Sequence, residues 1–194
     1  EIGKVIDTDI PIVGDAKVAL EKLLAYPYQP IQMTLWQELC QQRKNSYPFT
    51  FDRENTDEIK PQRLIEKIGE MTKGQAYVAT DVGQHQMWSA QHMTYTRPEN
   101  FITSSGLGTM GFGLPAAVGA QVARPNDTVI CVSGDGSFMM NVQELGTVKR
   151  KQLPLKILLL DNQRLGMVRQ WQQLFFEERY SETTLTDNPD FVTL

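Results

Sequence analysis

The chain has 194 residues, 41% hydrophobic and 22% charged, a composition typical of a globular protein with one well-packed domain. The formal net charge of −4 gives no electrostatic footprint for nucleic acid, and the longest apolar run, residues 157–160, is far shorter than the ~20 residues of a membrane helix. There is no signal peptide, and the two cysteines lack CxxC spacing, so we expect a cytoplasmic protein that binds neither nucleic acid nor membrane.

The N-terminal part of the chain is expected to hold two short elements and a linker. Residues 10–13 suit a short strand, and residues 16–25 suit an amphipathic helix. Residues 26–60 are polar and contain three prolines, which indicates a linker that carries a short helix over residues 35–43. Because the chain begins with Glu1 in place of methionine and ends soon after an apolar pair, we expect a piece of a longer protein.

Strands and helices alternate from Pro61 onward. This alternation predicts a doubly wound α/β domain built on a parallel sheet. Strands that lack a polar face favour a sheet covered by helices on both sides. In such sheets, ligands bind beyond the carboxyl ends of the strands. The predicted strands are residues 76–80, 101–103, 128–132 and 155–160, and the predicted helices are residues 63–71, 84–93, 114–122 and 139–150.

The sequence Ser-Gly-Asp-Gly-Ser at residues 133–137 directly follows the third predicted strand. Glycines on both sides of Asp135 allow close approach of a ligand, and the following helix offers backbone amides to an anion. A carboxylate there would repel a phosphate unless a cation lay between them, which favours a bound Mg²⁺. An ordinary strand-to-helix turn with Asp135 as a helix cap is the alternative.

A second polar loop follows the next predicted strand and contains Asn162. If the two strands are neighbours in the sheet, Asn162 brings a neutral oxygen ligand beside Asp135. A carboxylate, an amide oxygen, a backbone carbonyl, phosphate oxygens and water would form a suitable octahedral Mg²⁺ site.

Gly-Asp-Gly followed after about 25 residues by an Asn at a strand end resembles the diphosphate–Mg²⁺ motif of thiamine-diphosphate enzymes. The resemblance implies that Asp135 and Asn162 bind Mg²⁺ through their side chains, and Arg164 through its carbonyl. Asp161 stands where this motif usually has another Asn, but the Asn that binds the metal is retained.

Three further stretches resemble signatures of acetolactate (acetohydroxyacid) synthase catalytic subunits. They are DVGQHQMW at residues 81–88, SGLGTMGFGLP at 105–115 and RLGMVRQW at 164–171. Residues 97–191 look most similar to the enterobacterial isozyme II type of large subunit. The resemblance implies a thiamine-diphosphate-binding fold with three parts: residues 1–25 as the end of a middle FAD-binding α/β domain, 26–60 as a linker, and 61–194 as a truncated C-terminal domain for diphosphate and Mg²⁺.

The same resemblance implies roles for individual residues. Met110 would wedge under the cofactor and hold its two rings in a bent shape. Trp171, which shares a helix face with Met167, would select the second 2-oxo acid. Taken alone, Met110, Trp171 and Met167 would be read as ordinary core packing, and His85 as a surface or core histidine. The other implied cofactor contacts are Gln84, His85, Gly136 and Ser137 at the diphosphate, Gly108 and the Met110 backbone at the aminopyrimidine, and Gly166 and Met167 nearby.

Members of the resembled family also carry FAD. Asp15 and Ala16 match a contact to its adenosine, and Gln91, Ser105 and Gly106 match contacts near the flavin ring. Most of the FAD-binding domain would lie upstream of this chain.

The implied reaction is decarboxylation of pyruvate, followed by ligation of the two-carbon unit to a second pyruvate or to 2-oxobutanoate, in branched-chain amino acid biosynthesis. The implied partners are a second catalytic subunit and a small regulatory subunit. No glutamate here matches the family's cofactor-activating glutamate, so we expect the chain alone to be inactive.

Three other functions remain open on the residues. Gly106, Gly108 and Gly111 satisfy the GxGxxG fingerprint of NAD-dependent oxidoreductases, but the preceding predicted strand is short and Pro115 follows where the helix should run freely. Among thiamine-diphosphate enzymes, pyruvate oxidase, benzoylformate decarboxylase and glyoxylate carboligase are the closest rivals. A binding module that has lost catalysis is the third, although Asp135 and Asn162 are retained.

Overall fold

The computed structural model describes residues 2–28, 31–55 and 57–194. Residues 1, 29, 30 and 56, which belong to the predicted first domain and linker, lie outside the described residues. The chain forms two compact units, Glu1–Pro48 and Phe49–Leu194.

Among its described residues, the first unit has two helices, neither of which contains a buried residue. Helix α1 (Ala16–Ala25) begins after Asp15, whose carboxylate accepts a hydrogen bond from the Val18 amide at 3.1 Å. This N-cap satisfies one of the amides that the first turn leaves unpaired. Helix α2 (Thr34–Ser46) is longer than the predicted helix over residues 35–43. The strand predicted at residues 10–13 is wrong: residue 10 lies in a bend, residues 11–13 have no regular structure, and the stretch pairs with no strand of the described chain.

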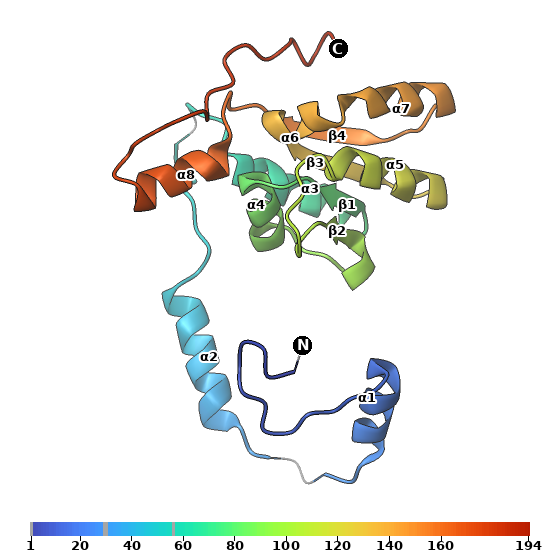
Figure 1. Ribbon diagram of the computed structural model, residues 1–194, viewed down its shortest axis with the longest axis vertical. Coiled ribbons are helices and arrows are strands. Elements are labelled where there is room, and N and C mark those ends of the chain that lie inside the picture. Colours follow the sequence, from blue (N-terminus) through green and yellow to red (C-terminus); the bar gives the residue numbers. More distant parts are fainter. Residues whose placement is uncertain (1, 29–30, 56) are drawn as a thin grey trace. The chain divides into compact units, whose positions relative to one another are not determined.

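In the second unit, four strands of the described residues form one parallel sheet with the order β2-β1-β3-β4 (Figure 1). These strands are β1 (Tyr77–Thr80), β2 (Phe101–Thr103), β3 (Val129–Gly134) and β4 (Lys156–Leu160). All four strand predictions were correct to within two residues at each end. β4 is less buried than its apolar sequence predicts, because it is an edge strand of this sheet.

Helices cover both faces of the sheet, which confirms the predicted doubly wound α/β fold. Alternate residues of each strand point to opposite faces, so Cys131 joins one apolar cluster and Val132 the other. On one face lie α5 (Gly113–Ala123), α6 (Asp135–Met140) and α7 (Leu145–Lys151), and on the other lie α3 (Pro61–Thr72) and α4 (Gln84–His92). The remaining elements are the 3₁₀ turns η1 (Pro98–Asn100) and η2 (Val142–Glu144) and the helix α8 (Gly166–Phe175).

The single helix predicted over residues 139–150 is interrupted. Helix α6 ends at Met140, and Asn141 leaves the helical conformation with φ −137°. The Asn141 side-chain amide donates to the Gly111 carbonyl at 2.7 Å. A short polar side chain that bonds to backbone elsewhere competes with the helix, so η2 and then α7 follow as separate elements.

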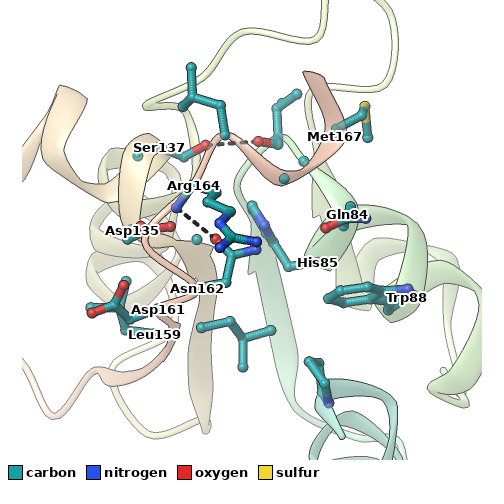
Figure 2. A pocket seen from close by; sticks show the side chains of 18 of the residues that line it. Gln84, His85, Trp88, Asp135, Ser137, Leu159, Asp161, Asn162, Arg164 and Met167 are labelled. Atoms are coloured by element: carbon teal, nitrogen blue, oxygen red, sulfur yellow. Dashed lines mark hydrogen bonds between the residues drawn. The ribbon is translucent and has the colours of Figure 1, made fainter. Parts of the chain in front are cut away.

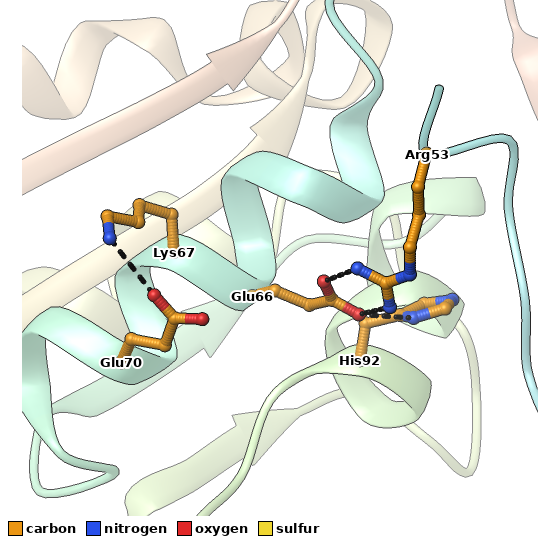
Figure 3. A network of polar contacts seen from close by, with 5 residues as sticks. All are labelled: Arg53, Glu66, Lys67, Glu70 and His92. Carbon is orange, nitrogen blue, oxygen red and sulfur yellow. Dashed lines mark hydrogen bonds and ion pairs between the residues drawn. The ribbon is translucent and has the colours of Figure 1, made fainter. Parts of the chain in front are cut away.

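Residues 49–60, the end of the predicted linker, contact helices α3 and α4. Figure 3 shows the Arg53 guanidinium bonded to both carboxylate oxygens of Glu66 at 2.7 Å. The same carboxylate lies 3.4 Å from His92 Nδ1, and the Phe51 ring meets the His92 ring edge-on at a centroid distance of 5.5 Å. Hydrogen bonding from Arg53 lowers the pKa of Glu66. These contacts attach residues 49–60 to the sheet domain, whereas the domain limits inferred from the sequence stay a prediction.

The chain shows no helix, over the residues with described structure, that combines the length and hydrophobicity needed to cross a membrane.

Candidate functional site

The strand order creates a crevice at one end of the sheet. From β1 the chain moves to β2 on one side, whereas β3 lies on the other side of β1. The loops after β1 and β3 therefore diverge, and a ligand site is expected where they separate. A cavity of about 570 Å³ lies there. Three segments form most of its lining: residues 82–85 after β1, 134–137 after β3 and 159–168 around the end of β4.

Asp135 and Asn162 come to adjoining strand ends, as the sequence predicted. Gly134 pairs with Leu160 across β3 and β4, so both polar loops begin at the same level of the sheet. Asp135 is buried, whereas Asn162 is exposed, and its Oδ1 accepts the Arg164 amide at 3.1 Å. Figure 2 shows the three side chains around one side of the cavity.

The electrostatics around Asp135 favour a cation. Burial raises the pKa of the Asp135 carboxyl, and the nearby negative charge of Asp161 raises it further. Hydrogen bonds from the Asn188 side chain and the Gly136 backbone act in the opposite direction. No group of three or more His, Cys, Asp or Glu that could hold a metal occurs in residues 2–28, 31–55 and 57–194. A cation here would therefore take amide, carbonyl, phosphate or water oxygens besides carboxylate, a set that suits Mg²⁺.

His85 contributes an unused hydrogen-bonding group to the cavity. The residue is 5% exposed, and its Nε2 has no hydrogen-bond partner within the described residues. Burial lowers the pKa of His85 to about 4, although the charge of Asp81 acts in the opposite direction, so the imidazole is neutral at pH 7. A buried polar nitrogen without a partner is uncommon in folded proteins. In this cavity it can bond a polar ligand, and it donates to an acceptor such as a diphosphate when Nε2 carries the ring proton.

Two glycines make room for the His85 ring. A Cβ on Gly83 would lie 2.8 Å from His85 Cε1, and a Cβ on Gly134 would lie 3.0 Å from His85 Nδ1. The first glycine of the Gly-Asp-Gly sequence is thus required by the histidine of another loop, a reason that the local sequence does not reveal.

Asp81 fixes the loop that carries Met110. Its side chain is fully buried and accepts hydrogen bonds from the Gly111 amide at 2.8 Å and the Gly113 amide at 3.1 Å. Met110, immediately before these amides, lines the cavity. Sequence reasoning used Asp81 only as part of a family signature and assigned it no role.

The other polar residues of the cavity are held by bonds between loops. Ser137 Oγ donates to the Val82 carbonyl at 2.7 Å, which joins the loops after β1 and β3. Gln84 Nε2 donates to Gln170 Oε1 of α8 at 3.0 Å. Gly166, at the start of α8, packs so closely on Gln84 that a Cβ would collide with the Gln84 amide.

Ten of the predicted site residues line this one cavity: Gln84, His85, Met110, Asp135, Gly136, Ser137, Asn162, Arg164, Gly166 and Met167. Their assignment as ligands of a cofactor or metal stays a prediction.

The remaining predicted residues lie elsewhere. Trp171 is 58% exposed and packs against Phe175 on α8, outside the cavity lining. Asp15 and Ala16 belong to the first unit, where Asp15 caps α1. Gly108, Gln91, Ser105 and Gly106 are exposed and do not line the cavity.

The GxGxxG stretch follows β2, an edge strand, and none of its three glycines lines the cavity. The helix predicted over residues 114–122 is present as α5, and Pro115 does not weaken it. Pro115 lies in the first turn, where a missing N–H leaves no helical bond unmade.

Sequence reasoning missed Asn188, which contacts Asp135 from about 50 residues further along the chain. It also missed Trp88 and Leu165, which line the cavity. Asn188 stands in a polar stretch without periodicity, so no local signal could have placed it at the site.

Comparison with known proteins identifies the domain. Residues 81–194 match the model of the thiamine pyrophosphate (thiamine diphosphate) enzyme C-terminal TPP binding domain. The whole chain is 63% identical to 34% of the acetolactate synthase isozyme 2 large subunit of Escherichia coli (strain K12), and 46% identical to 34% of the acetolactate synthase large subunit of Lactococcus lactis subsp. lactis (strain IL1403). It is 44% identical, over 32% of that protein's length, to an acetolactate synthase of Mycobacterium leprae (strain TN).

The chain thus spans about a third of the length of these curated relatives. The resemblance seen in the sequence motifs, and the fold that it implied for the sheet domain, are confirmed. Because the family match covers more than half of the chain, the chain belongs to the thiamine pyrophosphate enzymes, as their C-terminal TPP-binding domain.

Proposed function

We propose that this chain holds the diphosphate of thiamine diphosphate and a Mg²⁺ ion, as part of an acetolactate synthase large subunit. That enzyme would decarboxylate pyruvate and join the two-carbon unit to a second pyruvate or to 2-oxobutanoate. FAD, a second large subunit, a small regulatory subunit and a cytoplasmic location belong to the same proposal. The similarity to acetolactate synthase large subunits supports the activity, and the geometry of the cavity supports the cofactor.

One observation carries the proposal for the site. Buried Asp135, the oxygen-bearing Asn162 and the unpaired Nε2 of His85 lie around one cavity at the switch point of the sheet. A carboxylate beside an imidazole nitrogen that donates to an anion when it carries the ring proton suits a ligand that brings a cation and phosphate oxygens together.

The residues of this chain would bind and orient the cofactor. Asp135, the Asn162 oxygen and the Arg164 carbonyl would hold Mg²⁺, and His85, Gln84 and the amides of Gly136 and Ser137 would bond the diphosphate. When bound, thiamine diphosphate supplies the electron sink for decarboxylation and for carbon–carbon bond formation.

The apolar lining has a different task. Met110, held by the Asp81 bonds to the adjoining amides, would support the rings of the cofactor from one loop. Leu165 and Met167, at the start of α8, line the same cavity and would exclude water from the reacting atoms. Trp171 would reach the substrate only if α8 moved toward the cavity or a partner completed the site.

The test is calorimetric titration of the chain with thiamine diphosphate, with and without Mg²⁺. The unmodified chain should bind only in the presence of Mg²⁺, and Asp135→Ala should reduce the affinity at least about 100-fold, since a metal-bound charged group is lost. Asn126→Ala, a change of an exposed residue in the same domain, should leave binding unchanged. Mg²⁺-independent binding that Asp135→Ala does not weaken would contradict the proposed site.

A further inference from the structure

After α8 the chain comes back to the loop that follows β4, which contains Asn162. Residues 183–191, the return segment, run beside residues 163–165: the Leu165 amide donates to the Thr183 carbonyl at 2.9 Å, and the Leu185 amide donates to the Gln163 carbonyl at 2.8 Å. These two bonds fix the start of the return segment to the loop that follows β4.

The far end of the return segment is fixed as well. The Phe191 ring meets the Phe138 ring edge-on, at a centroid distance of 5.9 Å and an interplanar angle of 79°. Phe138 is buried in α6, the helix that begins with Asp135. The residues between Leu185 and Phe191 therefore cross beside the Gly-Asp-Gly loop.

Asn188, in the middle of this crossing, bonds to both carboxylates at the strand ends. Its Nδ2 lies 2.8 Å from Asp135 Oδ2 and 3.3 Å from Asp161 Oδ1. The Asn188 amide group donates hydrogen bonds but carries no net charge. It therefore reduces the repulsion between the two carboxylates, whereas only a cation would neutralise their charge. The amide bonds Asp135 Oδ2, one of the two oxygens through which this carboxylate could bind a cation.

We propose that Asn188 is a positioning residue that Mg²⁺ displaces: its amide bonds Asp135 and Asp161, and it leaves Asp135 Oδ2 when the ion binds that oxygen. The inference rests on the proposed function, which places Mg²⁺ at Asp135. A consequence of the displacement is that metal binding changes the position of the return segment. The displaced Asn188 side chain lies between the two fixed ends of that segment, so the two events are coupled.

The coupling has a direction. A ligand and a hydrogen bond that use the same carboxylate oxygen compete, so removal of the hydrogen bond strengthens binding of the ligand. Hydrogen bonds to charged groups are strong enough that Asn188→Ala should lower the Mg²⁺ dissociation constant about tenfold. The metal-free variant should also be less stable than the unmodified chain, whereas the Mg²⁺-bound forms should differ less.

Two measurements test this proposal. In the first, the side-chain amide resonance of Asn188 and the backbone amide resonance of Gly136 are followed by NMR in the unmodified ¹⁵N-labelled chain, during Mg²⁺ addition at saturating thiamine diphosphate. Both should shift, and the exposed Asn126 side-chain amide should not. In the second, calorimetry compares the Mg²⁺ affinity of Asn188→Ala with that of Asn126→Ala.

The outcomes separate the two proposals. A shift at Gly136 with no change at Asn188 would overturn the displacement and leave the metal site intact. Unchanged or weaker Mg²⁺ binding by a folded Asn188→Ala variant would also overturn it. If neither resonance responds to Mg²⁺, the metal site itself is wrong and the inference fails with it.

Discussion

Several glycines of the sheet domain stand where another chain group comes too close for a side chain. At Gly113 an added Cβ would lie 2.6 Å from the Asp81 nitrogen, a backbone atom in the centre of the domain. The same close approach lets the Gly113 amide reach Asp81 Oδ2. The glycine is therefore part of the arrangement that supports Met110.

We predict that Gly113→Ala destabilises the domain by about 1–3 kcal/mol, because backbone cannot move aside cheaply. Gly119→Ala is the matched control: it lies in the same helix, nothing lies within 4 Å of its added Cβ, and it should gain stability, by up to about 1 kcal/mol. Urea unfolding of both variants checks this. Equal effects of the two substitutions would refute the packing argument.

His85 makes the stability of the domain depend on pH. Its pKa is about 4 in the folded chain against an ordinary value of 6.5, so below pH 6.5 the unfolded chain binds a proton that the folded chain does not. Stability from the neutral imidazole is fully present above pH 6.5 and is lost as the pH falls toward 4.

We predict that the unmodified chain loses about 3 kcal/mol of unfolding free energy relative to His85→Gln between pH 7 and pH 4. The comparison cancels the titration of other groups, since glutamine carries no charge at any pH. Denaturant unfolding at several pH values measures it, and parallel pH curves for the two proteins would count against the buried neutral histidine.

At the scale of elements, the stretch before α3 belongs to the sheet domain by its contacts. Phe51 packs on His92 of α4, and Arg53 bonds Glu66 of α3. An exposed ion pair contributes little by itself, so the aromatic contact should matter more. These contacts favour a domain that begins near Phe49, whereas the sequence predicted one that begins at Pro61.

We predict that a chain shortened to residues 49–194 unfolds at the same temperature as the sheet domain of the full chain. A chain shortened to residues 61–194 should unfold roughly 2–6 °C lower, since it loses the contacts of Phe51 and Arg53. Calorimetric melting compares the two. Identical midpoints would support the boundary at Pro61.

For the whole molecule, the strand order decides where chemistry can occur. The chain adds β2 on one side of β1 and β3 on the other, and the cavity lies at the switch point between β1 and β3 of this parallel sheet. The chain covers about a third of the length of its acetolactate synthase relatives. In the proposed function, the exposed Trp171 would face a site that further parts of that enzyme complete.

The sequence by itself determined the doubly wound fold, because alternating apolar strands and helices leave few other ways to bury a core. The sequence also predicted that Asp135 and Asn162 lie close together, because the carboxyl ends of neighbouring parallel strands meet at the same end of a sheet. The prediction of a strand at residues 10–13 was wrong because a strand needs a neighbouring strand to pair with. The prediction of one helix over residues 139–150 was wrong because the Asn141 side chain bonds the distant Gly111 carbonyl.

Only the tertiary structure decided the roles of His85, Asp81 and Asn188. The first has a low pKa and an unpaired nitrogen because of burial, which depends on every element packed around it. The second bonds amides about 30 residues away, and the third contacts a carboxylate about 50 residues away. Such contacts depend on how separate elements pack, and no local pattern of residues records them.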